Sequence, residues 1–203
     1  MSIVEVPTPI DFRLMRDCLE WESKAMARPF RLDFFEAITN QLRRLKVSEL
    51  SILELGSGPG FLALYLLERL PEVKISLLDF SSAMHELAGK RLATYRERVK
   101  FVERNFKEVD WALGLGTYDV VVSIQSVHEL RHKLYAEALH HQVRTLLNEK
   151  GCYLVCDHYF GEDGLQNDQL YMTRDEQRSC LEIAGYNVTE ILTKGGRSLY
   201  HAA

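Results

Sequence analysis

The spacing of hydrophobic residues changes near residue 51. From Asp11 to Leu45, apolar side chains recur every three or four residues, which predicts helix. Pro29 disfavours helical backbone in the residue before it, so we expect two helices with a bend at Arg28–Phe30. After Ser51, short apolar runs alternate with helical patterns, and this alternation indicates an α/β fold.

Five apolar runs predict strands, at residues 51–55, 73–79, 99–103, 118–124 and 151–157. Helical patterns lie between them at 60–70, 81–95 and 132–148. Strands with almost continuous apolar side chains are typical of a parallel sheet that is covered on both faces. We therefore expect a mostly parallel sheet over residues 51–203, preceded by a helical cap over residues 1–50, in a single domain.

The C-terminal part of the chain has a different pattern. Thr173 and Glu176 have the spacing of a capping box, and Gly185 is a typical helix stop. Two apolar runs follow, with Gly195 and Gly196 between them, and such a glycine pair favours a tight hairpin. The sheet is therefore expected to end in an antiparallel strand.

Composition narrows the possible partners and locations. The chain has 203 residues and a net charge of -4, and it carries no cluster of basic residues large enough for a nucleic-acid interface. No apolar run approaches the roughly 18 residues of a membrane span, and the N-terminus has prolines and acids where a signal peptide has basic and apolar residues. We expect a cytoplasmic protein with no nucleic-acid or membrane partner. The four cysteines form no C-x-x-C pair, so a zinc knuckle or redox pair is not indicated.

The run ILELGSGPGFLALYLLE, residues 52–68, joins a predicted strand to a predicted helix through three glycines. Ligands of open α/β sheets bind at such strand ends, where glycine lets the backbone approach them closely. No Lys-Ser or Lys-Thr follows, which excludes a phosphate-binding P-loop. A dinucleotide fingerprint fails from Gly56, because Phe61 stands at its last position, but Ala63 completes a looser form from Gly58. The spacing alone therefore leaves an NAD-dependent oxidoreductase open.

ELGSGPG resembles the E/D-x-G-x-G-x-G motif of the class I S-adenosylmethionine-dependent methyltransferases, and similar segments continue over about residues 50–203. These are LLDFS after the second strand, ERNF after the third, YDVVVSIQSVHEL at the fourth, LLNEKGCYLVCD at the fifth and RDEQRSCLEIAGYNV near the end. The resemblance implies a doubly wound, seven-stranded, mostly parallel sheet with an antiparallel C-terminal strand. It also implies S-adenosylmethionine as the cofactor, bound by Glu54, Gly56, Ser57, Gly58, Gly60, Asp79, Phe80, Asn105, Phe106 and Ile124.

Charge and hydrogen bonding fit these implied roles. Glu54 can complement the cationic end of the cofactor, and the N-terminus of the 60–70 helix can take its carboxylate together with the glycine loop. Asp79 can accept hydrogen bonds from both ribose hydroxyls. Asn105 stands where the family usually has Asp, and its carbonyl can still accept from the adenine amine.

A second motif, His128-Glu129-Leu130-Arg131-His132, matches the H-E-x-x-H pattern of zinc hydrolases. It follows a predicted buried strand directly, and no extended zincin pattern accompanies it. We therefore expect no metal and keep a zinc hydrolase only as the least favoured alternative. His132, His140 and His141 are expected on the surface of a helix.

Methyl transfer is an in-line displacement from a sulfonium, so the enzyme mainly aligns and desolvates the reactants. A general base is needed when the acceptor must lose a proton. The candidates, at the ends of the fourth and fifth strands, are His128, Glu129, Asp157, His158 and Tyr159. We expect a small-molecule acceptor, since no N-P-P-[YF]-type motif follows the fourth strand. A cofactor-binding subunit without catalytic activity is the alternative from another class.

Overall fold

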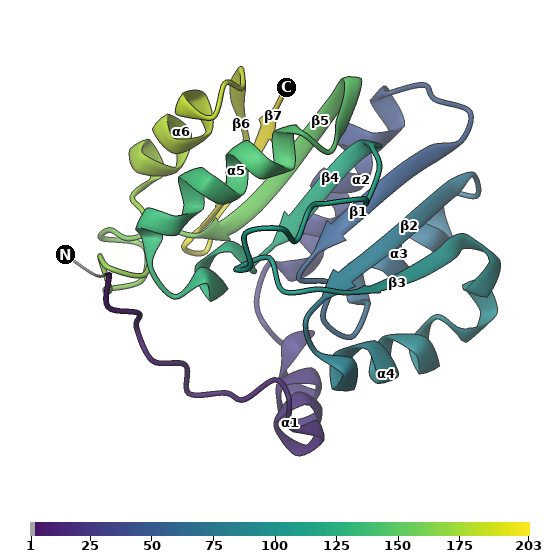
Figure 1. Ribbon diagram of the computed structural model, residues 1–203, viewed down its shortest axis with the longest axis horizontal. Coiled ribbons are helices and arrows are strands. Elements are labelled where there is room, and N and C mark those ends of the chain that lie inside the picture. Colours follow the sequence, from purple (N-terminus) through teal and green to yellow (C-terminus); the bar gives the residue numbers. More distant parts are fainter. Residues whose placement is uncertain (1–2) are drawn as a thin grey trace. The chain divides into compact units, whose positions relative to one another are not determined.

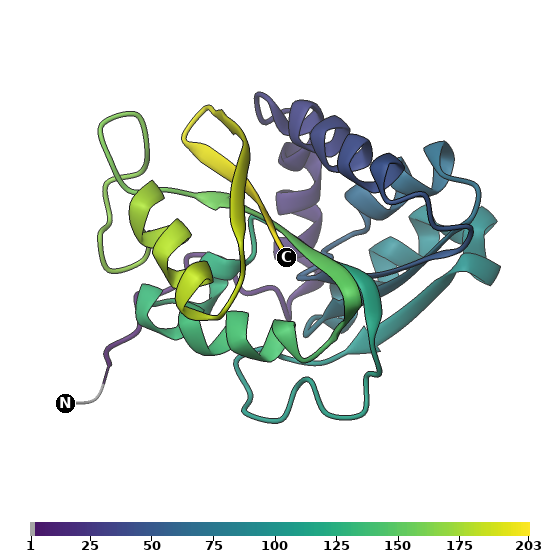
Figure 2. The ribbon, with the colours of Figure 1, turned by 90° about the horizontal axis from the view of Figure 1, so that it is seen from above.

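The computed structural model describes residues 3–203, which form two compact units (Figures 1 and 2). One unit comprises Pro9–Asn105. The other joins the N-terminal segment up to Thr8 to Phe106–Ala203. Each unit contains strands of an α/β fold and helices that pack on them.

The Pro9–Asn105 unit contains a parallel sheet with the strand order β3-β2-β1. Its elements are α1 (Met15–Ala25), α2 (Arg31–Arg44), β1 (Leu50–Leu55), α3 (Phe61–Arg69), β2 (Val73–Asp79), α4 (Ser82–Arg91), η1 (Ala93–Arg98) and β3 (Val99–Glu103). The chain breaks between α1 and α2 at Pro29, as predicted. Helix α1 packs on α4 through a core of Cys18, Ala83, Met84 and Leu87, while α2 packs on α3.

The Phe106–Ala203 unit has the strand order β4-β5-β7-β6. Its elements are β4 (Tyr118–Ile124), η2 (Val127–Leu130), η3 (Lys133–Tyr135), α5 (Ala136–Arg144), β5 (Leu147–His158), α6 (Arg174–Ile183), β6 (Val188–Lys194) and β7 (Arg197–Ala202). Strands β4 and β5 are parallel, and β7 runs antiparallel to both β5 and β6. Gly195 and Gly196 both have positive φ, as a tight hairpin turn requires, so the predicted C-terminal hairpin is confirmed.

Strand β5 begins at Leu147, within the region predicted as helix up to residue 148. Pairing with β4 explains the difference. The amide of Tyr118 donates to the carbonyl of Leu146, Leu147 pairs with Tyr118, and the Asn148 side-chain amide donates to Asp119 at 2.8 Å. These long-range bonds override a local helical pattern, which is a weak preference by comparison.

His140 was expected on a helix surface, but it is buried in α5. It lies on the same helix face as the buried residues Ala136 and Val143, and its ring centroid is 5.6 Å from that of Tyr153. Burial lowers the pKa of His140 to about 3, so its imidazole is neutral at physiological pH.

The capping box at the start of α6 is formed as predicted. The Thr173 hydroxyl accepts from the Glu176 amide at 3.1 Å, and the Glu176 carboxylate accepts from the Thr173 amide at 2.8 Å. We expect Thr173→Ala to lower the free energy of unfolding by about 1 kcal/mol, because it leaves a helix-terminal amide unpaired. Urea denaturation of Thr173→Ala and Thr173→Ser checks this. Serine keeps the acceptor, so equal losses in the two variants would contradict a capping role.

Candidate functional site

The predicted glycine loop joins β1 to α3 with an unusual backbone. Gly56, Gly58 and Gly60 have φ values of 63°, 52° and 76°, in the left-handed region that favours glycine. A Cβ atom at Gly60 would lie 3.2 Å from Leu92 Cδ1, so this glycine allows close packing on α4. A Cβ at Gly58 would meet nothing within 4 Å. The loop therefore presents bare backbone to open space at Gly58.

Asp79, at the end of β2, is buried and held by the backbone of two loops. Its Oδ2 accepts from the amide of Gly58 at 2.8 Å, and its Oδ1 accepts from the amide of Ser81 at 2.9 Å. Burial raises the pKa of Asp79, and these two hydrogen bonds work against the increase. The carboxylate thus has a fixed orientation, and each oxygen keeps a further lone pair for a ligand.

Glu54, near the end of β1, is 2% exposed. Within residues 3–203 its Oε2 has no hydrogen-bond partner, and neither does the buried hydroxyl of Ser57. Burial raises the pKa of Glu54 to about 8, although the nearby positive charge of Arg31 opposes the shift. Buried polar atoms without partners are costly, so these two mark a place where a ligand would supply the missing bonds.

His85 of α4 lies within electrostatic reach of Asp79, and the sequence analysis did not select it. Its ring centroid lies 5.3 Å from that of Phe101, and its Nε2 is buried without a partner among the described residues. Burial lowers the pKa of His85, and the charge of Asp79 opposes this shift only in part. Only its position four residues after the N-cap Ser81 could have indicated that it lies near Asp79.

The other predicted cofactor residues differ in burial and belong to different units. Phe80 is half-buried, and the guanidinium of Arg13 lies 5.6 Å from its ring centroid. Asn105 is also half-buried and belongs to the same unit as Glu54 and Asp79. Phe106 and Ile124 are buried and belong to the Phe106–Ala203 unit, as do the five candidate general bases.

The strand ends of the Phe106–Ala203 unit carry a histidine–aspartate pair. His128 Nδ1 lies 2.7 Å from Asp157 Oδ1, and the His128 amide donates to Asp157 Oδ2 at 2.9 Å. Burial by itself lowers the pKa of His128, but the charges and hydrogen bonds of Asp157 and Glu129 outweigh it and raise the pKa to about 10. Burial by itself would raise the pKa of Asp157, but the charges of His128 and His158 and the hydrogen bonds from His128 together lower it. The pair is therefore an imidazolium and a carboxylate at neutral pH.

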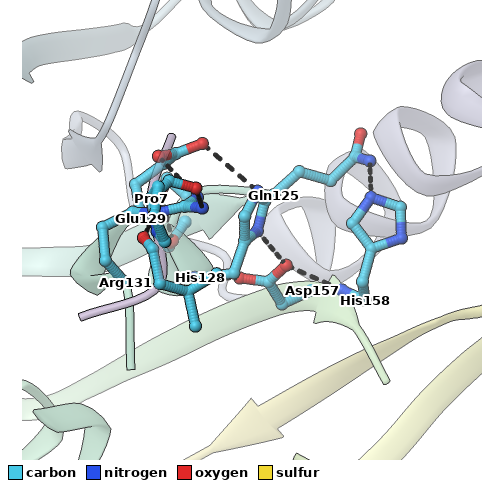
Figure 3. A network of polar contacts seen from close by, with 10 residues as sticks. Pro7, Gln125, His128, Glu129, Arg131, Asp157 and His158 are labelled. Atoms are coloured by element: carbon cyan, nitrogen blue, oxygen red, sulfur yellow. Dashed lines mark hydrogen bonds and ion pairs between the residues drawn. The ribbon is translucent and has the colours of Figure 1, made fainter. Parts of the chain in front are cut away.

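Glu129 extends this pair towards the N-terminal segment (Figure 3). Its Oε1 is 3.4 Å from His128 Nε2, and its Oε2 is 3.3 Å from a guanidinium nitrogen of Arg131. The same guanidinium donates to the carbonyls of Val6 and Pro7 at 2.9 and 2.7 Å. Both ring nitrogens of His128 are thus engaged by carboxylates, and its ring has a fixed position.

His158 lies on the other side of Asp157, in a cluster of rings. Its Nε2 is 2.8 Å from the side-chain nitrogen of Gln125, and its ring centroid is 5.6 Å from that of His128 and 5.9 Å from that of Tyr171. A small cavity of ≈ 20 Å³, enough for one water molecule, is lined by residues including His128, Asp157, His158 and Tyr171. The sequence analysis did not select Gln125 and Tyr171.

Tyr159, the remaining catalytic candidate, is buried beside this cluster. Its backbone is held at both ends, because its amide donates to Gly196 and its carbonyl accepts from Leu165. A Cβ at Gly164 would clash with that carbonyl, so the chain packs tightly here. These contacts fix the backbone of Tyr159.

The H-E-x-x-H motif does not form the helix that zinc hydrolases require. Residues Val127–Leu130 form a single 3₁₀ turn, and Arg131 ends it with a φ of 66°. His132 has extended backbone, and its Nδ1 accepts from the amide of Leu134. The two histidines therefore do not share a helix face, and residues 3–203 contain no group of three metal-binding side chains.

Comparisons with known proteins support the same fold family. Residues 52–151 match the family model described as "Methyltransferase domain". A malonyl-[acyl-carrier protein] O-methyltransferase of Geobacter sulfurreducens is 28% identical over 174 residues, which cover 77% of this chain and 62% of that protein. A carboxy-S-adenosyl-L-methionine synthase of Campylobacter lari is 23% identical over 170 residues, covering 84% of this chain and 69% of that protein. The chain thus spans less than two thirds of the Geobacter relative.

Solved structures agree at lower sequence identity. A SAM-dependent methyltransferase from Aquifex aeolicus superimposes with a TM-score of 0.68 at 19% identity, covering 89% of this chain and 96% of that one. The glycopeptide N-methyltransferase MtfA, solved with S-adenosylmethionine, superimposes with a TM-score of 0.65 at 19% identity, covering 84% and 93%. These similarities confirm the predicted α/β fold, with its mostly parallel strands and antiparallel C-terminal strand. Residues 52–151 of the chain therefore match the methyltransferase domain family, and the chain shares the fold of S-adenosylmethionine-dependent methyltransferases.

Proposed function

We propose that this protein binds S-adenosylmethionine and transfers its methyl group to a small-molecule acceptor. The observation that carries the proposal is the Asp79 carboxylate, which the Gly58 and Ser81 amides hold beside a glycine loop with open space. The match of residues 52–151 to the methyltransferase domain family favours S-adenosylmethionine as the occupant over NAD, whose support was the loop spacing alone.

The residues of the Pro9–Asn105 unit fit this cofactor. Asp79 would accept from the ribose hydroxyls, and the unpaired Oε2 of Glu54 would accept from the ammonium group. Gly56, Ser57, Gly58 and Gly60 would line its path, and Phe80, Asn105, Phe106 and Ile124 stay predictions for the adenine end. When bound, the cofactor supplies an activated methyl group on a cationic sulfur.

On the acceptor side, we infer different roles for the two histidines. His128 is charged and has both ring nitrogens engaged, so it cannot accept a proton at neutral pH. Its role would be to orient Asp157 and Glu129. His158 Nε2 lies 2.8 Å from the side-chain nitrogen of Gln125, and we propose His158 as the candidate general base for an acceptor that must lose a proton. Tyr171 lines the small cavity beside His158, and a catalytic role of Tyr159 stays a prediction.

Several expectations extend this proposal. We propose a cytoplasmic protein, and in residues 3–203 the structure contains no helix that is long and apolar enough to span a bilayer. We also propose that the two units function as one methyltransferase domain. The names of the relatives suggest two kinds of product, because the Geobacter protein is named for an O-methylation and the Campylobacter protein for making a carboxylated cofactor.

Calorimetric titration tests the cofactor assignment. S-adenosylhomocysteine is expected to bind and NAD is not. Asp79→Ala should weaken S-adenosylhomocysteine by about 10–100-fold, because it removes hydrogen bonds to a charged acceptor. Asp110→Asn, at an exposed position, is the control.

Binding of NAD alone, or equal affinity for S-adenosylhomocysteine in the Asp79 variant, would contradict the proposal. Incubation with S-adenosylmethionine and a panel of small acceptors, followed by mass spectrometry, then separates the possible activities. Methylated acceptor is the expected product. Cofactor binding without any product would favour the non-catalytic alternative.

A further inference from the structure

We propose that the N-terminal segment Val6–Pro7 is a positioning element of the acceptor side, and that Arg131 and Glu129 connect it to the ring of His128. This inference rests on the proposed function for the meaning of the acceptor side, and it adds positioning residues to it. The segment belongs to the same compact unit as Phe106–Ala203, although residues 9–105 separate the two in the sequence.

Arg131 holds both residues of the segment. Its carbonyl accepts from the Val6 amide at 2.8 Å, and its Nε donates to the Val6 carbonyl at 2.9 Å. Its Nη2 donates to the Pro7 carbonyl at 2.7 Å. Proline has no N–H, so Arg131 binds every backbone polar group of the two residues.

The local sequence favours an extended segment at this place. Val6 and Thr8 each precede a proline, which disfavours helical backbone at both positions. The segment therefore loses little conformational freedom when Arg131 holds it. Val6 is half-buried, while Pro7 and Thr8 are exposed, so hydrogen bonds contribute more to the attachment than apolar burial does.

The backbone of Arg131 is also fixed. The residue is 9% exposed and ends the 3₁₀ turn of η2 with a φ of 66°, a conformation that non-glycine residues rarely adopt. Its amide donates to the carbonyl of His128 at 3.0 Å. Such a backbone persists only where surrounding contacts hold it in place, and the bonds to Val6 and Pro7 are contacts of this kind.

Glu129 connects Arg131 to the histidine ring (Figure 3). Its Oε2 accepts from Nη1 of Arg131 at 3.3 Å, and its Oε1 lies 3.4 Å from Nε2 of His128. Burial by itself raises the pKa of Glu129, but the hydrogen bond and charge of His128 and the charge of Arg131 outweigh it and lower the pKa. One ionised carboxylate therefore bridges a guanidinium and an imidazolium, and its position depends on both.

The other ring nitrogen of His128 is held independently. Nδ1 lies 2.7 Å from Asp157 Oδ1, and Asp157 also accepts from the amides of His128 and His158. Strand β5 thus holds Nδ1, whereas Glu129, Arg131 and the N-terminal segment hold Nε2. The further titratable groups at the cavity beside the ring are His132, Lys133, His158 and Tyr171.

Solvent exchange measured by NMR on the full chain tests the inference. At neutral pH both ring nitrogens of His128 carry protons, so isotope-labelled histidine gives two signals, and the Val6 amide gives a third. Arg131→Met should speed exchange of the Val6 amide by about 10–100-fold, because it removes two hydrogen bonds from a charged donor. It should speed exchange of the Nε2 proton by about 2–30-fold and leave the Nδ1 proton unchanged.

Glu129→Gln tests the connection in the other direction. Loss of the charge that holds the Arg131 guanidinium should speed exchange of the Val6 amide by about 2–30-fold. Glu5→Gln is the matched control. Glu5 is next to Val6 in the chain, and its carboxylate pairs with Lys107 at 2.6 Å at the surface, so its loss should leave all three exchange rates unchanged.

An unchanged Nε2 proton in Arg131→Met would show that Arg131 only anchors the segment, and would overturn the inference. Equal acceleration of both ring protons would overturn it too, because it would indicate general loosening of the unit. An unchanged Val6 amide in Glu129→Gln has the same meaning, even if Arg131→Met does not fold. These measurements use neither cofactor nor acceptor, so each of these outcomes leaves the proposed function standing. Failure of S-adenosylhomocysteine to bind would contradict the proposed function and leave these exchange rates as they are.

Discussion

Asp157→Ala is expected to lower the free energy of unfolding by about 3–5 kcal/mol, the largest stability change that we predict. The substitution removes the carboxylate that pairs with the buried His128 at 2.7 Å, and removing one partner of a buried ion pair leaves an uncompensated charge. It also removes the acceptor of two backbone amides, those of His128 and His158. Chemical denaturation of the variant measures the loss.

The same pair predicts how stability changes with pH. The pKa of His128 is raised in the folded protein, so its contribution is complete below the unfolded value near 6.5 and is lost as the pH rises towards about 10. The pKa of Asp157 is lowered, so its contribution is complete above about 4 and is lost in more acidic solution. The pair should therefore stabilise the protein most between about pH 4 and pH 6.5.

The contribution of this pair can be measured by comparing the wild-type protein with Asp157→Asn. The free energy of unfolding of each is measured between pH 6 and pH 9. The wild type should lose up to about 1.4 kcal/mol more per pH unit than the variant. Asp175→Asn, at an exposed position in α6, should behave like the wild type. Parallel pH profiles for the wild type and Asp157→Asn would show that His128 is not held as a cation.

The sequence predicted the strands well because they are short and because β2 and β4 are mostly buried. Strands β2, β3 and β4 have the predicted bounds, and the helix break at Pro29 and the hairpin at Gly195–Gly196 follow from local backbone chemistry. The start of β5 could not be predicted in this way, because its pairing with Tyr118 is a long-range contact.

Site residues at the ends of strands could be predicted from the sequence. Site residues whose role depends on contacts with distant parts of the chain could not. Asp79 and Asp157 lie at strand ends, and the sequence analysis selected both. Arg31 is one arginine in a helical segment, but its charge acts on Glu54 and its guanidinium lies near the ring of Phe61, contacts that no local spacing indicates. Gln125 contacts His158 from a backbone with positive φ. The sequence could not predict this conformation, because non-glycine residues rarely adopt it.

Glu54→Gln is expected to raise the stability of the folded protein and to weaken binding of the cofactor. At pH 7.5 the variant should be more stable than the wild type by about 1–3 kcal/mol, because the pKa of Glu54 is raised to about 8 in the folded protein. Stability associated with this group is present below the unfolded pKa, near 4.3, and is lost as the pH rises towards 8. Glutamine cannot ionise, so the loss should disappear in the variant.

Binding should change in the opposite direction. Glu54→Gln is expected to weaken S-adenosylhomocysteine by about 10–100-fold, since an amide replaces the charged partner of the ammonium group. Methylthioadenosine has the same nucleoside without the amino-acid end, and its binding should be unaffected. At pH 6.5 the free wild-type carboxyl is mostly protonated, so pairing with an ammonium group requires it to release a proton. Titrations in two buffers with different heats of ionisation measure that proton.

The difference between the two ligands isolates Glu54, because both ligands engage Asp79 and only S-adenosylhomocysteine carries an ammonium group. In the wild type, S-adenosylhomocysteine should release nearly one proton more than methylthioadenosine, and in Glu54→Gln the difference should vanish. Equal proton release by the two ligands in the wild type would mean that Glu54 stays neutral in the complex. The unpaired Oε2 would then be a cost of folding with no part in cofactor binding.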